Sequence, residues 1–97
     1  MPDVRGIAAA YGVRVEVADL GDWAAVTLVA EYDPDGPVIR VNERELWRTA
    51  SRDAIDLAIA HELYHHREAI GEIARIAGRS ARERAADAFA DDLVRAR

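Results

Sequence analysis

The stretch His61-Glu62-Leu63-Tyr64-His65 organises the whole chain, because it forms an H-E-x-x-H pattern within the longest helical segment. Two histidines at positions i and i+4 stand one above the other on a single helix face. Their imidazoles therefore offer two nitrogen ligands to one metal ion, and zinc is well suited to such donors. Glu62 leaves the helix about 100° away from His61, where it can reach a water on that metal. The alternative interpretation is an exposed His/Glu face on an ordinary helix.

The composition is typical of one small soluble globular domain, which we expect to span residues 1–97. A net charge of −5 argues against direct binding of nucleic acid, which needs clustered basic residues. There is no cysteine, so disulfides and thiolate metal sites are excluded. The sequence has neither a signal-peptide pattern nor an apolar run that could span a bilayer. We therefore expect a cytoplasmic protein without a membrane partner, and the oligomeric state stays open.

The first half of the chain predicts a helix followed by three strands. Residues 3–11 carry apolar side chains at helical spacing, and residues 13–17 alternate between apolar and polar side chains, as a half-buried strand does. Residues 23–32 are rich in β-formers at their centre and predict a second strand. Residues 33–37 (Asp-Pro-Asp-Gly-Pro) predict a turn, and residues 38–41 a third strand. The second and third strands should therefore pair as a hairpin.

Capping residues divide the next part of the chain into helices. Asn42 can cap a short helix over residues 43–48, and an ordered loop is the alternative for this segment. Ser51 is expected to cap the long helix that carries the H-E-x-x-H motif, with Gly71 at its end. The predicted core-facing residues of this long helix are Ile55, Ala58, Ile59, Leu63 and Ile70.

The remainder of the chain also predicts helix. A short helix is expected over residues 72–77, and Ser80 is expected to begin a last helix that continues to near the C-terminus. The predicted core-facing residues of the last helix are Ala86, Phe89, Ala90, Leu93 and Val94. The fold class is therefore α+β, with a small three-stranded sheet packed on the motif helix and a C-terminal helix.

A catalytic zinc site takes a third protein ligand in addition to two histidines. Glu83 and Asp87 are at i and i+4 on the last helix, beside its core-facing residues, and we assign Glu83 as the third ligand. Asp87 is expected to accept a hydrogen bond from the free ring nitrogen of a ligand histidine. However, Ser80 and Glu83 also spell a capping box, in which Glu83 would fold back onto the backbone. Asp87, Glu72 and His66 are alternative ligands.

Several neighbours of these residues have simpler explanations. His66 should point about 100° away from the histidine before it, which makes it a rim residue or a substrate contact. Leu63 and Tyr64 are interpreted as packing residues, and Asp91 and Asp92 as part of a solvated face.

Three segments resemble the ImmA/IrrE-type zinc metallopeptidases. Residues 39–42 (Ile-Arg-Val-Asn) are similar to a strand that ends in Ile-x-x-Asn, and residues 60–66 (Ala-His-Glu-Leu-Tyr-His-His) are similar to the A-H-E-L-x-H helix of that family. Glu83 with residues 86–90 (Ala-Asp-Ala-Phe-Ala) is similar to a later helix that reads roughly E-x-E-A-N-x-F-A. The resemblance extends from about residue 10 to residue 94. The chain departs from the pattern at Ala85, in place of a second Glu, and at Asp87, in place of Asn.

The resemblance implies a minimal zincin-like fold that holds one zinc ion. It implies His61, His65 and Glu83 as ligands and Glu62 as the catalytic base. It also suggests that the substrate is a specific regulatory protein, such as a transcriptional repressor, rather than bulk protein.

The first functional hypothesis is a zinc-dependent metalloendopeptidase in which Glu62 removes a proton from zinc-bound water. A protein or peptide substrate is expected to lie along an exposed edge strand, which we assign to residues 38–41. A further donor should stabilise the oxyanion, and His66, Tyr32 or an arginine are candidates.

The second hypothesis is a zinc-stabilised protein-binding module with little or no hydrolytic activity, in which the metal supplies folding energy. Glu62 separates the two, because a purely structural zinc site has no use for it. A metal-free helical interaction domain is a third interpretation.

Overall fold

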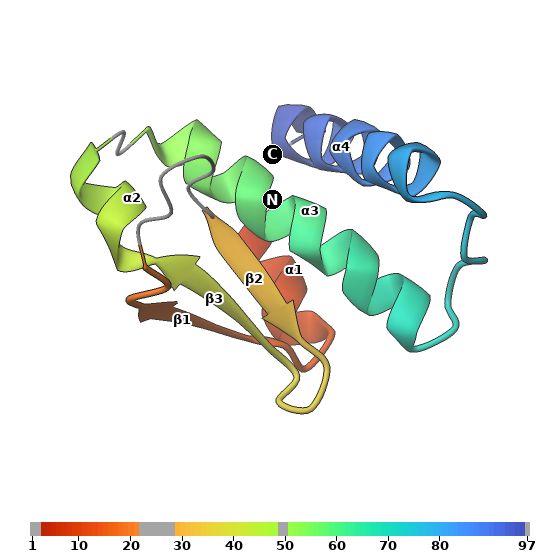
Figure 1. Ribbon diagram of the computed structural model, residues 1–97, viewed down its shortest axis with the longest axis horizontal. Helices are drawn as coiled ribbons and strands as arrows, with labels where there is room; N and C mark the ends of the chain where they lie inside the picture. The colour runs from red at the N-terminus through yellow and green to blue at the C-terminus, as the bar shows by residue number, and fades with distance from the viewer. Residues whose placement is uncertain (1–2, 22–28, 49–50, 97) are drawn as a thin grey trace.

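The long helix that carries the histidine pair lies between the sheet and the C-terminal helix in the computed structural model (Figure 1). The structure describes residues 3–21, 29–48 and 51–96. The chain forms an α+β fold whose elements are, in order, α1 (Val4–Ala10), β1 (Arg14–Ala18), β2 (Ala30–Asp33), β3 (Val38–Asn42), α2 (Glu43–Arg48), α3 (Arg52–Ala69) and α4 (Arg79–Ala96).

The three strands form one sheet in the order β1-β3-β2. β2 pairs antiparallel with β3, so the predicted hairpin is confirmed, and β1 pairs parallel with β3. The assignment of residues 38–41 to an edge strand is wrong, because β3 is central in this sheet. Val38, Ile39 and Val41 are buried in this strand, which has a neighbouring strand on each side. Within the described residues, β2 has a neighbour on one side only and is therefore the edge strand beside α3.

The second predicted strand is described only at its end. β2 covers Ala30–Asp33, whereas residues 22–28 lie outside the described residues. The predicted turn follows β2, and its first carboxylate stabilises it: Asp33 Oδ1 accepts a hydrogen bond of 3.0 Å from the backbone N–H of Asp35.

Helix α3 begins and ends where its capping residues predict. Ser51 Oγ accepts a hydrogen bond of 3.3 Å from the backbone N–H of Ala54, and Gly71 adopts a φ of 76° just after the helix. Ile55, Ile59 and Leu63 are buried against the sheet and α1. Ile70 is 55% exposed, so its place among the core-facing residues was predicted wrongly. It is the C-cap residue, where the backbone leaves the helix and the helical spacing no longer applies.

The predicted helix over residues 72–77 is wrong, because this segment is an irregular loop. Its first residues turn back onto the preceding helix: the N–H groups of Glu72 and Ile73 donate to the carbonyl of Arg67. Six residues bounded by two glycines form too few helical hydrogen bonds to offset the cost of helix nucleation.

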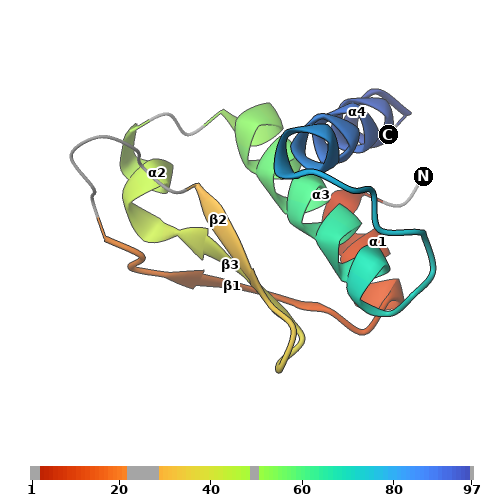
Figure 2. The ribbon, with the colours of Figure 1, turned by 45° about the vertical axis from the view of Figure 1, so that its right-hand side comes forward.

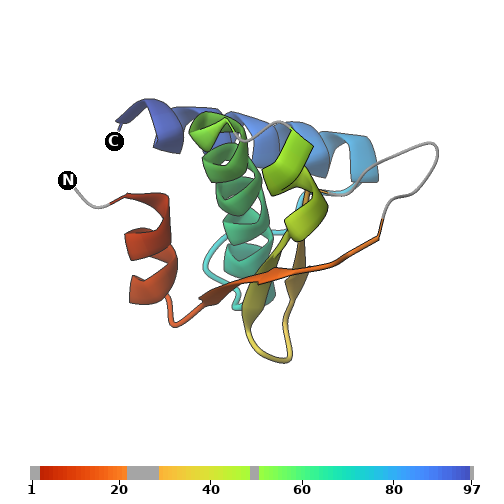
Figure 3. The same ribbon diagram turned by 90° about the vertical axis from the view of Figure 1, so that its left-hand side faces the viewer.

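Helix α4 lies across α3 (Figures 2 and 3). Ala86 and Ala90 are buried against α3, and the other predicted core-facing side chains of α4 are partly buried there, so that prediction is confirmed. The small alanines bring the two helices close together, and this places side chains of α4 next to the histidines of α3. The sheet packs on α3 rather than on α4, so α3 is the central layer.

The buried cluster joins α1, the sheet and α3, with one contribution from α4. Its members are Val4, Ala8, Val13, Ala30, Ile39, Val41, Ile55, Ile59, Ala60, Leu63 and Ala90. No helix in the described part of the chain has both the length and the apolar composition that crossing a bilayer requires.

Candidate metal centre

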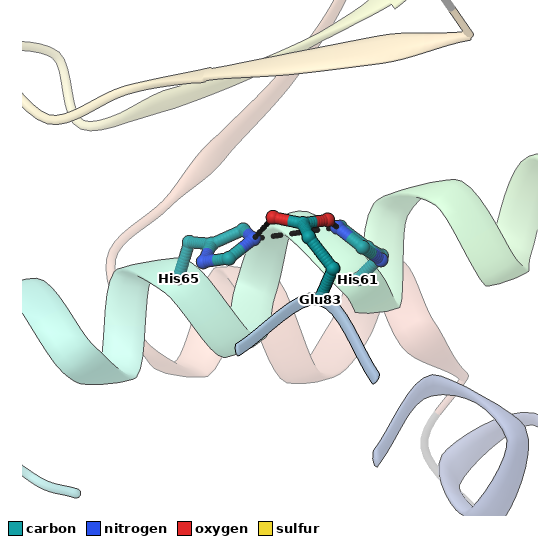
Figure 4. Close-up of side chains that lie close together, drawn as sticks. All are labelled: His61, His65 and Glu83. Carbon is teal, nitrogen blue, oxygen red and sulfur yellow. Dashed lines mark hydrogen bonds and ion pairs between the residues drawn. The ribbon is translucent and has the colours of Figure 1, made fainter. Parts of the chain in front are cut away.

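His61 and His65 present their ring nitrogens to the same point on the surface of α3 (Figure 4). Their Nε2 atoms are 3.3 Å apart, and both side chains are largely but not completely buried. This proximity follows from the helix itself, because residues four apart lie on the same face.

Glu83 of α4 completes the cluster. Its Oε2 atom lies 2.9 Å from His61 Nε2, and its Oε1 atom lies 3.4 Å from His65 Nε2. The donor atoms of these three residues all lie within 4.8 Å of one another. The structure therefore brings together the two histidines of the motif and the downstream glutamate.

The competing capping-box arrangement is not adopted. α4 begins at Arg79, so Ser80 lies within the helix rather than at its N-cap. The first helical hydrogen bond of α4 starts at Gly78, two residues before Ser80: the N–H of Arg82 donates to the carbonyl of Gly78. Glu83 is consequently free to turn toward α3.

Each histidine also contacts a further carboxylate through its other ring nitrogen, Nδ1. His61 Nδ1 lies 2.7 Å from Asp87 Oδ1, and His65 Nδ1 lies 2.8 Å from Glu68 Oε1. A carboxylate accepts a hydrogen bond from Nδ1–H, and a proton on each Nδ1 would make both Nε2 lone pairs available to a metal ion held between the histidines and Glu83. Asp87 thus lies where its predicted role requires.

Glu68 was not anticipated from the sequence. Its side chain is only 4% exposed, and Arg82 of α4 binds it through two hydrogen bonds of 2.9 and 3.1 Å. These bonds from Arg82, with a further contribution from His65, lower the pKa of Glu68 to about 2. The available signal was its position three residues after His65, which places both on one helix face.

Glu62 lies beside the cluster in a cavity of about 280 Å³ next to β2. Burial raises the pKa of its carboxyl group above the ordinary range, and the neighbouring His61 and His65 partly oppose this shift. Apolar residues form most of the cavity wall: Val29, Ala30, Leu57 and Ala58. A carboxylate with a raised pKa next to a metal-binding group has the properties of a general base.

The predicted rim position of His66 is wrong, because this side chain is only 4% exposed. Burial lowers the pKa of His66. The hydroxyl of Tyr32 lies 2.7 Å from His66 Nδ1, so the neutral imidazole can accept a hydrogen bond from it. Tyr32 extends from β2 and lines a cavity of about 210 Å³ beside His65. Of these two candidate oxyanion donors, Tyr32 is the one that lines a cavity, and its single hydroxyl proton would have to turn away from His66 Nδ1 to reach an oxyanion.

The remaining candidates lie away from the cluster or serve packing. Glu72 lies just beyond the C-terminal end of α3, where it accepts hydrogen bonds from the hydroxyl of Tyr11, at the end of α1, and from Arg67 of α3. Leu63 and Tyr64 are buried, as predicted for packing residues. Asp91 and Asp92 are exposed, as predicted for a solvated face.

The donor spacing can be compared with the geometry of bound zinc. Ligand atoms at 2.0–2.1 Å from zinc in a tetrahedral arrangement lie about 3.3–3.4 Å apart. The two Nε2 atoms are 3.3 Å apart, which matches this spacing, and a different oxygen of Glu83 faces each of them, at 2.9 Å from His61 and 3.4 Å from His65. Two imidazoles and one carboxylate are also the donor set of a catalytic zinc site. The residues present therefore fit the metal.

A scan of the sequence against protein-family models, and searches of curated proteins and of solved structures, found no match to this chain. 

Proposed function

We propose that this chain is a zinc-dependent metalloendopeptidase with a minimal zincin-like fold, similar to the ImmA/IrrE type. The observation that supports this most directly is the convergence of His61, His65 and Glu83, whose donor atoms lie within 4.8 Å of one another and whose two Nε2 atoms have the spacing of tetrahedral zinc ligands. The partly buried Glu62 beside them supports hydrolysis rather than a purely structural role.

In this mechanism His61, His65 and Glu83 would hold one zinc ion, and Asp87 and Glu68 orient the imidazoles. A zinc ion held there would supply Lewis-acid chemistry, that is, a lower pKa for a water molecule at the site and polarisation of the scissile carbonyl. Glu62 accepts the proton of the attacking water and passes it to the leaving amine. The raised pKa of Glu62 favours the first of these steps, because it makes the carboxylate a stronger base.

A peptide substrate would lie along β2, the edge strand next to the site. Adding an extended peptide to a free sheet edge satisfies its backbone hydrogen bonds and holds the scissile bond in place. Tyr32, on this same strand, is the candidate for stabilising the oxyanion once its hydroxyl turns from His66 Nδ1 toward the cavity. The family resemblance suggests a regulatory protein as the substrate.

The test begins with the metal. The protein, purified without chelator, is expected to contain one zinc per chain by elemental analysis, and added zinc should restore the metal after chelation. The zinc-loaded protein is then incubated with candidate regulators from neighbouring genes, and cleavage is followed by mass spectrometry. Metal that stays substoichiometric after zinc addition would contradict the proposal.

The second candidate is a zinc-stabilised protein-binding module. It is favoured by one observation: Glu83 and Arg82 of α4 both reach across to α3, so a metal held there would also fasten two helices together. This candidate predicts zinc-dependent stability and partner binding without cleavage.

A further inference from the structure

The cavity beside His65 differs in character from the cavity that contains Glu62. It has a volume of about 210 Å³, and its lining includes Tyr32, His65, Glu68, Arg75 and Arg82. Arg75 and Arg82 also line a second hollow of about 450 Å³, together with Arg79 and Glu83. Three guanidinium groups therefore border the His65 end of the site.

These arginines differ in whether their charge is already paired within the protein. Arg82 donates two hydrogen bonds to Glu68, and Glu83 faces the histidine pair. Arg75 and Arg79 are exposed, and across residues 3–21, 29–48 and 51–96 the structure records no carboxylate paired with either. In a chain with a net charge of −5, the metal centre thus has unpaired cations at one end.

The direction of β2 relates this end to a bound peptide. β2 runs alongside α3 in the same direction, from Ala30 beside the Glu62 cavity to Tyr32 beside the His65 cavity (Figure 1). Antiparallel pairing is the more stable arrangement for an added strand. An antiparallel peptide would pass His65 first, so residues before the cleaved bond would meet the arginines. Residues after the bond would meet the apolar wall near Leu57.

We propose that the His65 cavity is a subsite for an acidic side chain located N-terminal to the cleaved bond, with Arg75 as its main recognition group. The fixed fork of a guanidinium can bind a carboxylate through two parallel hydrogen bonds. This inference rests on the proposed function and deepens it by defining a substrate class: peptides with Asp or Glu before the scissile bond and an apolar residue after it.

The test uses a degenerate mixture of acetylated dodecapeptides and the zinc-loaded full chain. Sequencing the products by mass spectrometry gives the residue frequencies on both sides of each cut. Asp and Glu are expected to exceed Lys and Arg by about fivefold at one of the positions before the bond, the factor that corresponds to a surface ion pair at the upper end of its usual strength. Arg75→Ala should remove this preference, and Arg75→Glu should replace it with a preference for Lys and Arg.

Arg84→Ala provides the matched control, because Arg84 is an exposed arginine of α4 that lines none of these cavities. It should leave the preference unchanged. A binding measurement complements cleavage. Fluorescence anisotropy is used to measure the binding of two labelled hexapeptides to zinc-loaded Glu62→Gln protein. The two peptides are identical except for Asp or Lys at the second position. The Asp peptide should bind more tightly, and Arg75→Glu added to this protein should reverse the order.

The outcomes separate the two proposals. Cleavage without an acidic preference, or with one that Arg75→Glu leaves intact, overturns the subsite and leaves the peptidase standing. Binding of the Asp peptide that depends on Arg75, without any cleavage, supports the subsite and overturns the peptidase. The absence of both cleavage and Arg75-dependent binding overturns both.

Discussion

The two histidine ends of the metal centre are built differently, although each imidazole meets a carboxylate at nearly the same distance. Asp87, behind His61, has a side chain that is 73% exposed, whereas Glu68, behind His65, is 4% exposed and bound by Arg82. The His61 end has an apolar cavity with Glu62, and the His65 end is bordered by arginines. Both carboxylates therefore connect α3 with α4, but in different ways: the exposed Asp87 of α4 contacts His61 directly, whereas the buried Glu68 of α3 is joined to α4 through Arg82.

The largest expected effect tests whether the chemistry lies at the His61 end. Glu62→Gln keeps size and helix propensity but removes the base, so cleavage should fall by a factor of about 10² or more. Zinc content and thermal stability should stay unchanged, because Glu62 is not among the three donors. Glu43→Gln, an exposed glutamate of α2, serves as the control. Equal cleavage by wild type and Glu62→Gln would favour the zinc-stabilised binding module.

The next largest effect concerns Glu83, whose carboxylate faces both His61 and His65. Glu83→Gln removes the carboxylate that faces both Nε2 atoms, so zinc affinity should fall by more than the ~10–100-fold that is typical for losing a residue behind a ligand. Competition with a chromophoric chelator measures this affinity. Ser80→Ala should change stability by no more than about 0.5 kcal/mol, because Ser80 is not the N-cap of α4. Unchanged zinc affinity in Glu83→Gln would remove Glu83 from the ligand set.

Replacing Glu68 and replacing Asp87 should have different effects on the stability of the zinc-free protein. Glu68→Gln should lower zinc affinity by about 10–100-fold and also destabilise the zinc-free protein by about 1–3 kcal/mol, since Arg82 loses a buried charged partner. Asp87→Ala should lower zinc affinity by a similar or smaller factor but change stability by no more than about 0.5 kcal/mol. Urea denaturation with chelator present gives both stabilities. Equal destabilisation by the two variants would contradict the assigned difference between the ends.

The smallest effect is a pH dependence that belongs to the His65 end. The folded-state pKa of Glu68 is about 2, below its ordinary value of 4.5, so its stabilising contribution is complete above pH 4.5 and is lost as the pH falls from 4.5 towards 2. The difference in stability between zinc-free wild type and Glu68→Gln should therefore shrink over this interval. Thermal melts from pH 7 to pH 3 measure it. A difference that stays constant over this range would mean that the Arg82 contact does not hold Glu68 ionised.

Elements with strong local signals were predicted correctly. Ser51 and Gly71 mark the ends of α3, and the Asp-Pro-Asp-Gly-Pro turn joins two paired strands. In each case a side-chain hydrogen bond or a backbone conformation within a few residues determines the structure. The segment over residues 72–77 was predicted wrongly, because six residues between two glycines form too few helical hydrogen bonds to offset helix nucleation.

The errors at the site have a common cause, which is that sequence spacing does not specify neighbours from other elements. His66 points away from the histidine pair as its position on the helix predicts, but that direction leads under Tyr11 and Tyr32 rather than to solvent. The edge strand was misassigned because β1 pairs parallel with β3, and its alternating pattern could not show on which side of the hairpin it would add.

The sequence by itself determined the paired histidines and the separate direction of Glu62, since about 100° of rotation per residue sets both within one helix. Only the tertiary structure decided whether Glu83 caps its own helix or faces α3, and which carboxylate stands behind His65. It also decided which strand edge lies along the site. These outcomes depend on where α4 and the sheet pack against α3, and that is set by burial of side chains that are far apart in the chain, such as Leu63 and Ala90.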